Sequence, residues 1–215
     1  MNDLKEHITK TGTTTLAIIC KDGVIIAGDK RTTRGHEVVN RETRKVHLIN
    51  KNIVATMAEV ASDAERLIKL ISAEVRLSEL KLRRKARVKE VASLLKTIVY
   101  GNIRNPSVIT PITAFIMGGY DEDGPKIFNI GPDGSLSDID SFITSGSGGD
   151  FAISVLEDSY KKDITVKEGI ELAKRALNVA LLRDSASGNG FHIYSVTKDG
   201  AKLELEESIN TGIKL

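Results

Sequence analysis

The sequence has very little cysteine, no long apolar stretch and almost no net charge. Cys20 is the single cysteine, so the chain can form no internal disulfide and no cysteine-based metal cluster. The four histidines are scattered and do not replace such a cluster. No apolar run approaches the ~20 residues needed to cross a bilayer, and residues 1–10 mix both charges without the apolar core of a signal peptide. We therefore expect a cytoplasmic protein with no membrane partner and no metal.

The charged residues that are present do not favour a nucleic-acid partner. Lys and Arg number 31 against 29 Asp and Glu, which leaves a net charge of +2 with both signs spread along most of the chain. A nucleic-acid-binding protein is expected to gather basic residues on one face. The length of 215 residues suits one domain with a substantial core, and no internal repeat or Pro-rich linker divides it.

The first quarter of the chain is typical of β-structure. Residues 13–58 contain two predicted strand pairs, TTTLAIIC with GVIIAGD and KVHLIN with IVATMA. The first pair reverses at Lys21-Asp22-Gly23 and the second at Asn50-Lys51-Asn52.

Two helices are predicted next, because the apolar spacing changes from two residues to three or four. A capping box at Ser62 to Glu65 marks the start of the first helix, with Ser62 as its N-cap. The second helix is expected to end near Asn105-Pro106. The basic cluster Lys81 to Lys89 lies between them and is interpreted as a solvated connection.

The second half repeats this order of strands and then helices. Strands are expected at ITAFIMGG, at KIFNIG and around SFIT, and a closing strand at FHIYSVT. One helix is expected from about Gly149 to Tyr160, and another follows a capping box that opens at Thr165 and runs to Arg183. Hairpins alternating with helix pairs favour two antiparallel sheets face to face with helices outside, an α+β fold.

A possible reaction centre stands at the start of the first strand. Thr13, Thr14 and Thr15 are good strand residues, which is their ordinary interpretation. Gly12 before them leaves its carbonyl open to close approach, which suits a Gly–Thr bond that is cut. Cleavage there would give Thr13 a free α-amine with an ordinary pKa of about 7.7–8.0, close enough to neutrality to accept the hydroxyl proton. One residue would then supply both nucleophile and base.

The chain resembles archaeal-type proteasome β subunits of the N-terminal nucleophile (Ntn) hydrolase superfamily from about Gly12 to Thr197. The motifs that carry the resemblance, in order and spacing, are Gly12-Thr13-Thr14-Thr15, Lys21-Asp22-Gly23, Gly28-Asp29-Lys30-Arg31, Lys45, Gly146-Ser147-Gly148 and Arg183-Asp184-Ser185-Ala186-Ser187-Gly188. The resemblance implies a four-layer αββα sandwich at residues 13–215 and a propeptide at residues 1–12 that is removed autocatalytically between Gly12 and Thr13.

The family's catalytic roles fall on three residues of this chain. The resemblance places Thr13 as the nucleophile, Asp29 as the acid at the end of the second strand, and Lys45 as the lysine that tunes the base. A lysine ammonium beside Thr13 disfavours the protonated amine and stabilises a developing alkoxide. Without the resemblance, the sequence would predict that Lys45 is a solvent-facing strand residue and that Asp29 is a turn residue at the end of a strand.

The resemblance also places Ser147, Asp184 and Ser187 around the threonine amine as hydrogen-bonding partners. A phosphate cradle is the rival interpretation of Gly146 to Gly149, but this loop lacks the Lys-Ser/Thr ending of a P-loop.

One position departs from the family pattern. Active members usually carry a glycine whose N–H is the oxyanion donor, within a pattern like Ala-Gly-x-x-Gly-Asp-Ala, and here Glu59 stands at that glycine and Ser62 at the second. The Glu59 N–H remains, but its carboxylate beside an oxyanion disfavours negative charge, and losing such a donor typically costs about 10²–10³ in rate. A structural, catalytically weak β subunit is therefore an open alternative.

By resemblance, Thr32, Thr43, Met57 and Ala61 line the pocket for the substrate residue before the cut. Met57 would give this pocket an apolar floor, and core packing is its alternative role.

The sequence leads to one functional hypothesis and two alternatives. The hypothesis is a threonine endopeptidase that degrades unfolded proteins within a four-ring barrel, with no cofactor. The resemblance implies a heptameric α-subunit ring, further β subunits of the same or a second type, and an ATPase unfoldase as partners. The alternatives are the structural β subunit and an N-terminal threonine amidase acting on a small molecule, which native size would separate from a ring.

Overall fold

The computed structural model describes residues 12–59, 61–106 and 112–209, without the side chains of Glu59 and of residues 61–63. It has two five-stranded antiparallel sheets. The first has the order β10-β1-β2-β11-β12, formed by Phe142–Ser145, Thr15–Cys20, Gly23–Asp29, Gly190–Thr197 and Gly200–Ser208. The second has the order β5-β6-β7-β8-β9, formed by Val46–Asn50, Ile53–Glu59, Thr113–Asp121, Gly124–Ile130 and Leu136–Ile139.

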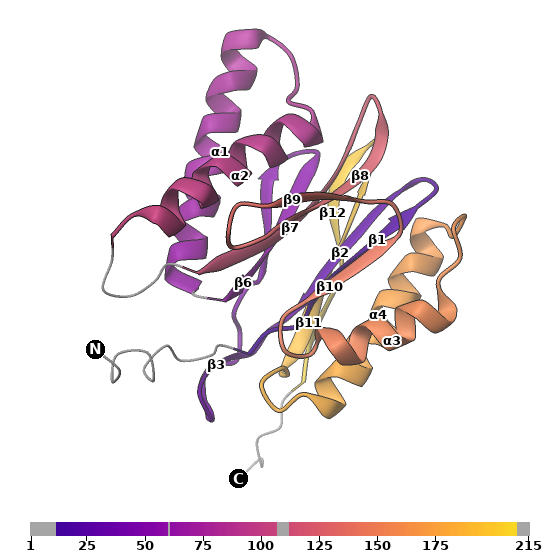
Figure 1. Cartoon of the computed structure of the whole chain (residues 1–215). Helices are drawn as coiled ribbons and strands as arrows, with labels where there is room; N and C mark the ends of the chain where they lie inside the picture. The colour runs from indigo at the N-terminus through magenta and orange to yellow at the C-terminus, as the bar shows by residue number, and fades with distance from the viewer. Residues whose placement is uncertain (1–11, 60, 107–111, 210–215) are drawn as a thin grey trace.

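Helices cover the outer face of each sheet (Figure 1). Helices α1 (Ala61–Leu82) and α2 (Val88–Arg104) pack on the second sheet, and α3 (Gly149–Ser159) and α4 (Val166–Arg183) pack on the first. A two-stranded ribbon, β3 (Thr32–Arg34) with β4 (Glu37–Asn40), stands apart from both sheets. The α+β fold and its four-layer αββα arrangement are therefore confirmed.

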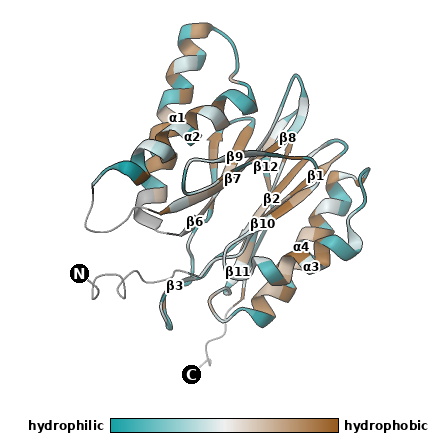
Figure 2. Ribbon diagram, viewed as in Figure 1, coloured by the Kyte–Doolittle hydropathy of each residue, from teal (hydrophilic) through white to brown (hydrophobic). Residues whose placement is uncertain are grey.

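Three apolar clusters fill the spaces between the layers. One lies between α1, α2 and the second sheet, one between the two sheets, and one between α3, α4 and the first sheet. Figure 2 shows hydrophobic colour on the strands and on parts of the helices that cover them. Gly118 on β7 lets the sheets approach closely, because a Cβ there would lie 2.5 Å from the Ile26 side chain of β2.

Local signals gave most element positions correctly. The β1–β2 hairpin reverses at Lys21-Asp22, and the Thr165 hydroxyl caps α4 by accepting the Glu168 N–H. The connection between α1 and α2 is exposed, as expected, except at the half-buried Ala86.

Two expectations need correction. Helix α1 begins at Ala61, so Ser62 lies within its first turn and is not the residue preceding it. The strand at FHIYSVT does not close the fold, since β12 follows and pairs with it from Gly190 to Thr197.

Candidate active site

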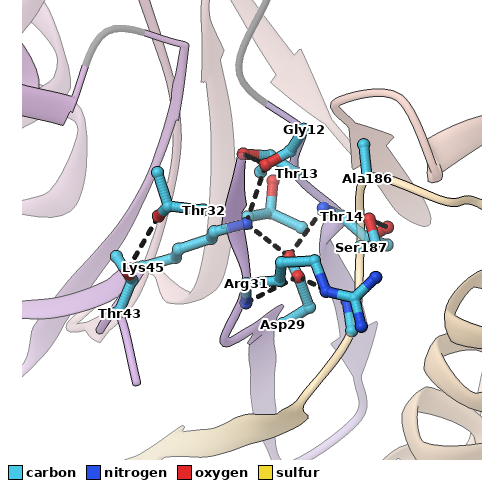
Figure 3. A network of polar contacts seen from close by, with 12 residues as sticks. Gly12, Thr13, Thr14, Asp29, Arg31, Thr32, Thr43, Lys45, Ala186 and Ser187 are labelled. Atoms are coloured by element: carbon cyan, nitrogen blue, oxygen red, sulfur yellow. Dashed lines mark hydrogen bonds and ion pairs between the residues drawn. The ribbon is translucent and has the colours of Figure 1, made fainter. Parts of the chain in front are cut away.

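The candidate nucleophile lies at the entrance to β1, surrounded by segments that are distant in the sequence (Figure 3). Thr13 is 4% exposed, and its hydroxyl donates a 2.7 Å hydrogen bond to the Gly12 carbonyl. Its N–H donates to the Ser147 hydroxyl at 3.3 Å, and its carbonyl accepts the Gly148 N–H at 3.3 Å. The hydroxyl is therefore held against the carbonyl of the bond that cleavage would break.

Asp29 and Lys45 form a buried ion pair beside this bond. Asp29 ends β2 and Lys45 directly precedes β5, so adjacent ends of the two sheets supply the two charges. The Lys45 ammonium lies 2.6 Å from Asp29 Oδ1 and 3.1 Å from the Gly12 carbonyl oxygen, and the two side chains are 3% and 0% exposed. The Gly12 carbonyl thus receives hydrogen bonds from both Thr13 and Lys45.

Three backbone N–H groups hold the Asp29 carboxylate in addition to Lys45. Oδ1 accepts the Thr14 N–H at 2.9 Å, and Oδ2 accepts the N–H groups of Arg31 and Gly188, each at 3.0 Å. Burial lowers the pKa of Lys45, although the negative charge and hydrogen bond of Asp29 act in the opposite direction. Lys45 is therefore a cation that can give up its proton more readily than an exposed lysine.

Ser147, Asp184 and Ser187 form a connected chain of hydrogen bonds on the other side of Thr13. The hydroxyls of Ser147 and Ser187 donate to Asp184 Oδ2 at 2.7 and 2.6 Å. The Thr14 and Ser187 hydroxyls lie 2.7 Å apart. Asp184 is the C-cap of α4, so this helix positions the carboxylate at the start of β1.

The glycine loop before α3 wraps around the Thr13 main chain. Gly146 has a φ of +90°, and a Cβ there would lie 2.1 Å from the Thr13 carbonyl oxygen. The N–H groups of Gly148 and Gly149 donate to the carbonyls of Thr13 and Gly146. These donors are used within the protein, which argues against the phosphate cradle.

The remaining predicted site residues are less closely tied to Thr13. The hydroxyls of Thr32 and Thr43 lie 2.7 Å apart, so these two expected pocket residues do meet. Met57 is 4% exposed and packs in the cluster under α1 and α2, which is the core-packing role. The backbone of Glu59 pairs with Thr113 at the end of β6. The side chains of Glu59 and Ala61 lie outside the described part of the chain, so their roles stay predictions.

Sequence reasoning gave no site role to several polar residues that build the site. Thr33 accepts the Gly12 N–H at 2.9 Å, and the Arg31 guanidinium donates to the side chain of Asn189 and the carbonyl of Ser185. Thr14 is fully buried and bonded to Ser187. Their partners are distant in sequence, so the only local signal was the run of threonines after Gly12.

Comparisons with known proteins identify the family of this chain. The family model described as "Proteasome subunit" matches residues 9–196. The chain belongs to the proteasome subunit family. It is 39% identical over 199 residues to a proteasome subunit beta of Methanobrevibacter smithii, covering 93% of this chain and 94% of that protein. It is 38% identical to a proteasome subunit beta of Archaeoglobus profundus, over 93% of this chain and 91% of that protein. It is 36% identical to a proteasome subunit beta of Methanococcus maripaludis, over 94% of this chain and 91% of that protein.

The resemblance to archaeal proteasome β subunits is thereby confirmed, and the sandwich observed is the one it implied. For the ranges of this proteasome subunit that the structure describes, no helix is long and apolar enough to span a membrane. The same ranges contain no group of three or more Asp, Glu, His or Cys residues placed to hold a metal ion.

Proposed function

We propose that this chain is a core-particle β subunit that works as a threonine endopeptidase on unfolded proteins, after its own Gly12–Thr13 bond is cut. The observation that carries the proposal is the position of the Lys45 ammonium, within hydrogen-bonding distance of both Asp29 and the Gly12 carbonyl. A buried ammonium needs such partners to stay charged, and a carbonyl that accepts its hydrogen bond is made more electrophilic.

Self-cleavage would begin with the contacts already formed around Gly12. The Thr13 oxygen attacks the Gly12 carbonyl carbon, and the oxygen that develops negative charge accepts hydrogen bonds from Lys45. The carbon–nitrogen bond then breaks, and the hydroxyl proton ends on the Thr13 nitrogen. Water hydrolyses the resulting ester, which leaves a Gly12 carboxylate and a free Thr13 amine.

The same oxygen would then act on substrate. Thr13 Oγ attacks a peptide carbonyl and its proton passes to the new α-amine, which later returns a proton to the leaving amine of the substrate. Ser147, linked to Asp184, lies at the Thr13 nitrogen and would orient this amine. Water then releases the acylated fragment and restores the hydroxyl.

Assembly completes the proposal. The chain would join heptameric β rings between heptameric α-subunit rings, alone or with a second β type, and receive substrates from an ATPase unfoldase in the cytoplasm. Family membership and the relatives named proteasome subunit beta support this arrangement.

A structural β subunit is the second candidate, and Glu59 is the observation that favours it. Its carboxylate stands where active members usually have glycine. A negative charge near the oxyanion would slow both self-cleavage and peptide hydrolysis.

Replacement of Thr13 and Lys45 separates these candidates. We expect Thr13→Ala and Lys45→Ala, each assembled with the α partner, to form particles of normal size that retain residues 1–12 and do not hydrolyse fluorogenic peptides. Lys69→Ala, an exposed change on α1, is the matched control and should be processed and active. Near-normal peptidase activity in Lys45→Ala would refute the proposed chemistry, and an inactive wild type would favour the structural subunit.

A further inference from the structure

A second lysine close to the site is buried, and neither step of the proposed chemistry uses it. Lys30 follows Asp29 at the end of β2, and its side chain is only 1% exposed. Burying an ammonium is costly unless it is paired and hydrogen-bonded. The burial of Lys30 therefore points to a structural or functional role that an exposed surface lysine does not have.

The Lys30 ammonium uses all three of its N–H donors. It donates to Glu42 Oε2 and Glu206 Oε1, each at 3.0 Å, and to the Ser208 hydroxyl at 2.7 Å. Burial lowers the pKa of Lys30, but the hydrogen bonds and charges of Glu206 and Glu42 outweigh this effect and raise it. Lys30 thus remains a cation throughout the neutral range.

These acceptors belong to two segments that are far apart in the sequence. Glu206 and Ser208 lie on β12, whereas Glu42 lies in the connection between β4 and β5. The backbone strengthens the link, because the Lys30 carbonyl accepts the Thr43 N–H at 2.9 Å and its N–H donates to the Gly190 carbonyl at 3.0 Å. Lys30 therefore joins the 42–45 segment to the first sheet.

The 42–45 segment ends at Lys45, which carries the ion pair of the candidate active site. Asp29 and Lys30 are neighbours in the chain, and they hold this segment at two points, through Lys45 and through Glu42. Without the Lys30 ammonium, the Glu42 and Glu206 carboxylates would face each other without a shared cation and repel. Glu206 would keep His192, whose Nε2 lies 3.1 Å away, so Glu42 is the carboxylate left unpaired.

We infer that Lys30 is a positioning residue, which fixes the 42–45 segment so that the Lys45 ammonium stays in place beside Asp29 and the reacting carbonyl. The inference rests on the proposed threonine chemistry. It assigns Lys30 no contact with substrate, so its loss should affect the chemical step and leave substrate binding nearly unchanged.

The test compares Lys30→Met with Lys30→Arg in particles assembled with the α partner. Lys30→Met should lower kcat for a fluorogenic peptide by about 10-fold or more, with KM changed less than about twofold. Lys30→Arg keeps the cation and should recover most of the lost kcat. Lys202→Met removes a lysine of β12 that is 71% exposed and pairs with Glu204, and it should behave as wild type.

Glu42→Gln covers the case in which Lys30→Met does not assemble. Glu42 is 65% exposed, and this change leaves Glu206 and Ser208 bonded to Lys30. It should lower kcat several-fold without changing KM. The inference would be overturned if Lys30→Met kept the wild-type kcat. If Lys30→Met does not assemble, a wild-type kcat in Glu42→Gln would overturn it instead. An active Lys45→Ala particle would instead overturn the proposed function.

Discussion

The contacts of the Asp29–Lys45 pair predict that its two members are unequal in their effect on stability. Removing the lysine leaves a carboxylate that still accepts three backbone N–H groups, from Thr14, Arg31 and Gly188. Replacing the carboxylate with an amide leaves a buried ammonium without its counter-charge, and its other acceptor, the Gly12 carbonyl, is neutral. We therefore expect Asp29→Asn to destabilise the chain more than Lys45→Met.

The size of the difference follows from what each residue loses. Lys45→Met removes two charge-assisted hydrogen bonds, one to Asp29 and one to the Gly12 carbonyl, at about 2 kcal/mol each. In the native chain, the two carboxylate oxygens of Asp29 accept four hydrogen bonds. The amide of Asp29→Asn has only one oxygen, so two of the four donors would face its NH₂ group. Each unsatisfied donor destabilises the fold by about 1–3 kcal/mol. Lys45 also loses its counter-charge. The resulting destabilisation cannot exceed about 4 kcal/mol at pH 7.5, because that is the free energy needed to deprotonate a lysine of ordinary pKa, and the ammonium would then become neutral. Asp29→Asn should therefore be less stable than Lys45→Met by about 2 kcal/mol or more.

The stability of Asp29→Asn should also change with pH in a direction that can be checked. In Asp29→Asn the pKa of Lys45 in the folded state falls further below its unfolded value, so the unfolded chain binds more protons than the folded one. Stability of that variant then rises with pH, by up to about 1.4 kcal/mol per pH unit between pH 7 and 9. Lys45→Met has no lysine at this position and lacks this contribution.

Urea unfolding of the full-length, uncleaved chain measures both effects. The Thr13→Ala background prevents processing, and the urea midpoint of Asp29→Asn should lie at least about 1 M below that of Lys45→Met at pH 7.5. The gap should narrow at pH 9. Equal midpoints at both pH values, with equal slopes, would show that Asp29 is not held by the contacts described.

Two further predictions concern backbone space and the oxyanion. Gly146→Ala should prevent cleavage before Thr13, because φ is +90° and the new Cβ would lie 2.1 Å from the Thr13 carbonyl oxygen. The control Gly101→Ala on α2 places its Cβ where nothing lies within 4 Å, so processing should be unchanged. N-terminal sequencing of assembled particles measures both outcomes, and a processed Gly146→Ala chain would contradict the prediction. Glu59→Gly should raise kcat about tenfold, or about 1.4 kcal/mol, when variants are compared at one pH well above ~4.3; an unchanged or lower kcat would remove the repulsion argument.

The elements that sequence analysis predicted well are those fixed by neighbouring residues. The Lys21-Asp22 hairpin and the Thr165 cap depend on side chains within a few positions, and both are observed. Strand β12 was missed because it is an edge strand with many charged residues, which read as a polar tail. The exposed ribbon strand β4 likewise has no buried face to give it an alternating pattern.

Apart from Gly12 and Thr13, the candidate site was predictable only through the resemblance. Asp29 and Lys45 are 16 residues apart, and nothing in their own neighbourhoods shows that one end of each sheet would bring them together. The burial of Lys30 was equally hidden, since a lysine flanked by charged residues is ordinarily exposed. Its three acceptors come from β12 and from the segment before β5, and only the packed sheets place them around one ammonium.

The measurement that tests the central claim most directly is the intact mass of this chain after assembly with its α-subunit partner. The proposed chemistry requires a free amine on Thr13, so the mass should equal that of residues 13–215, with the Gly12–Thr13 bond cut. Particles that assemble fully but contain only the uncut chain would contradict the claim and leave Thr13 without its base.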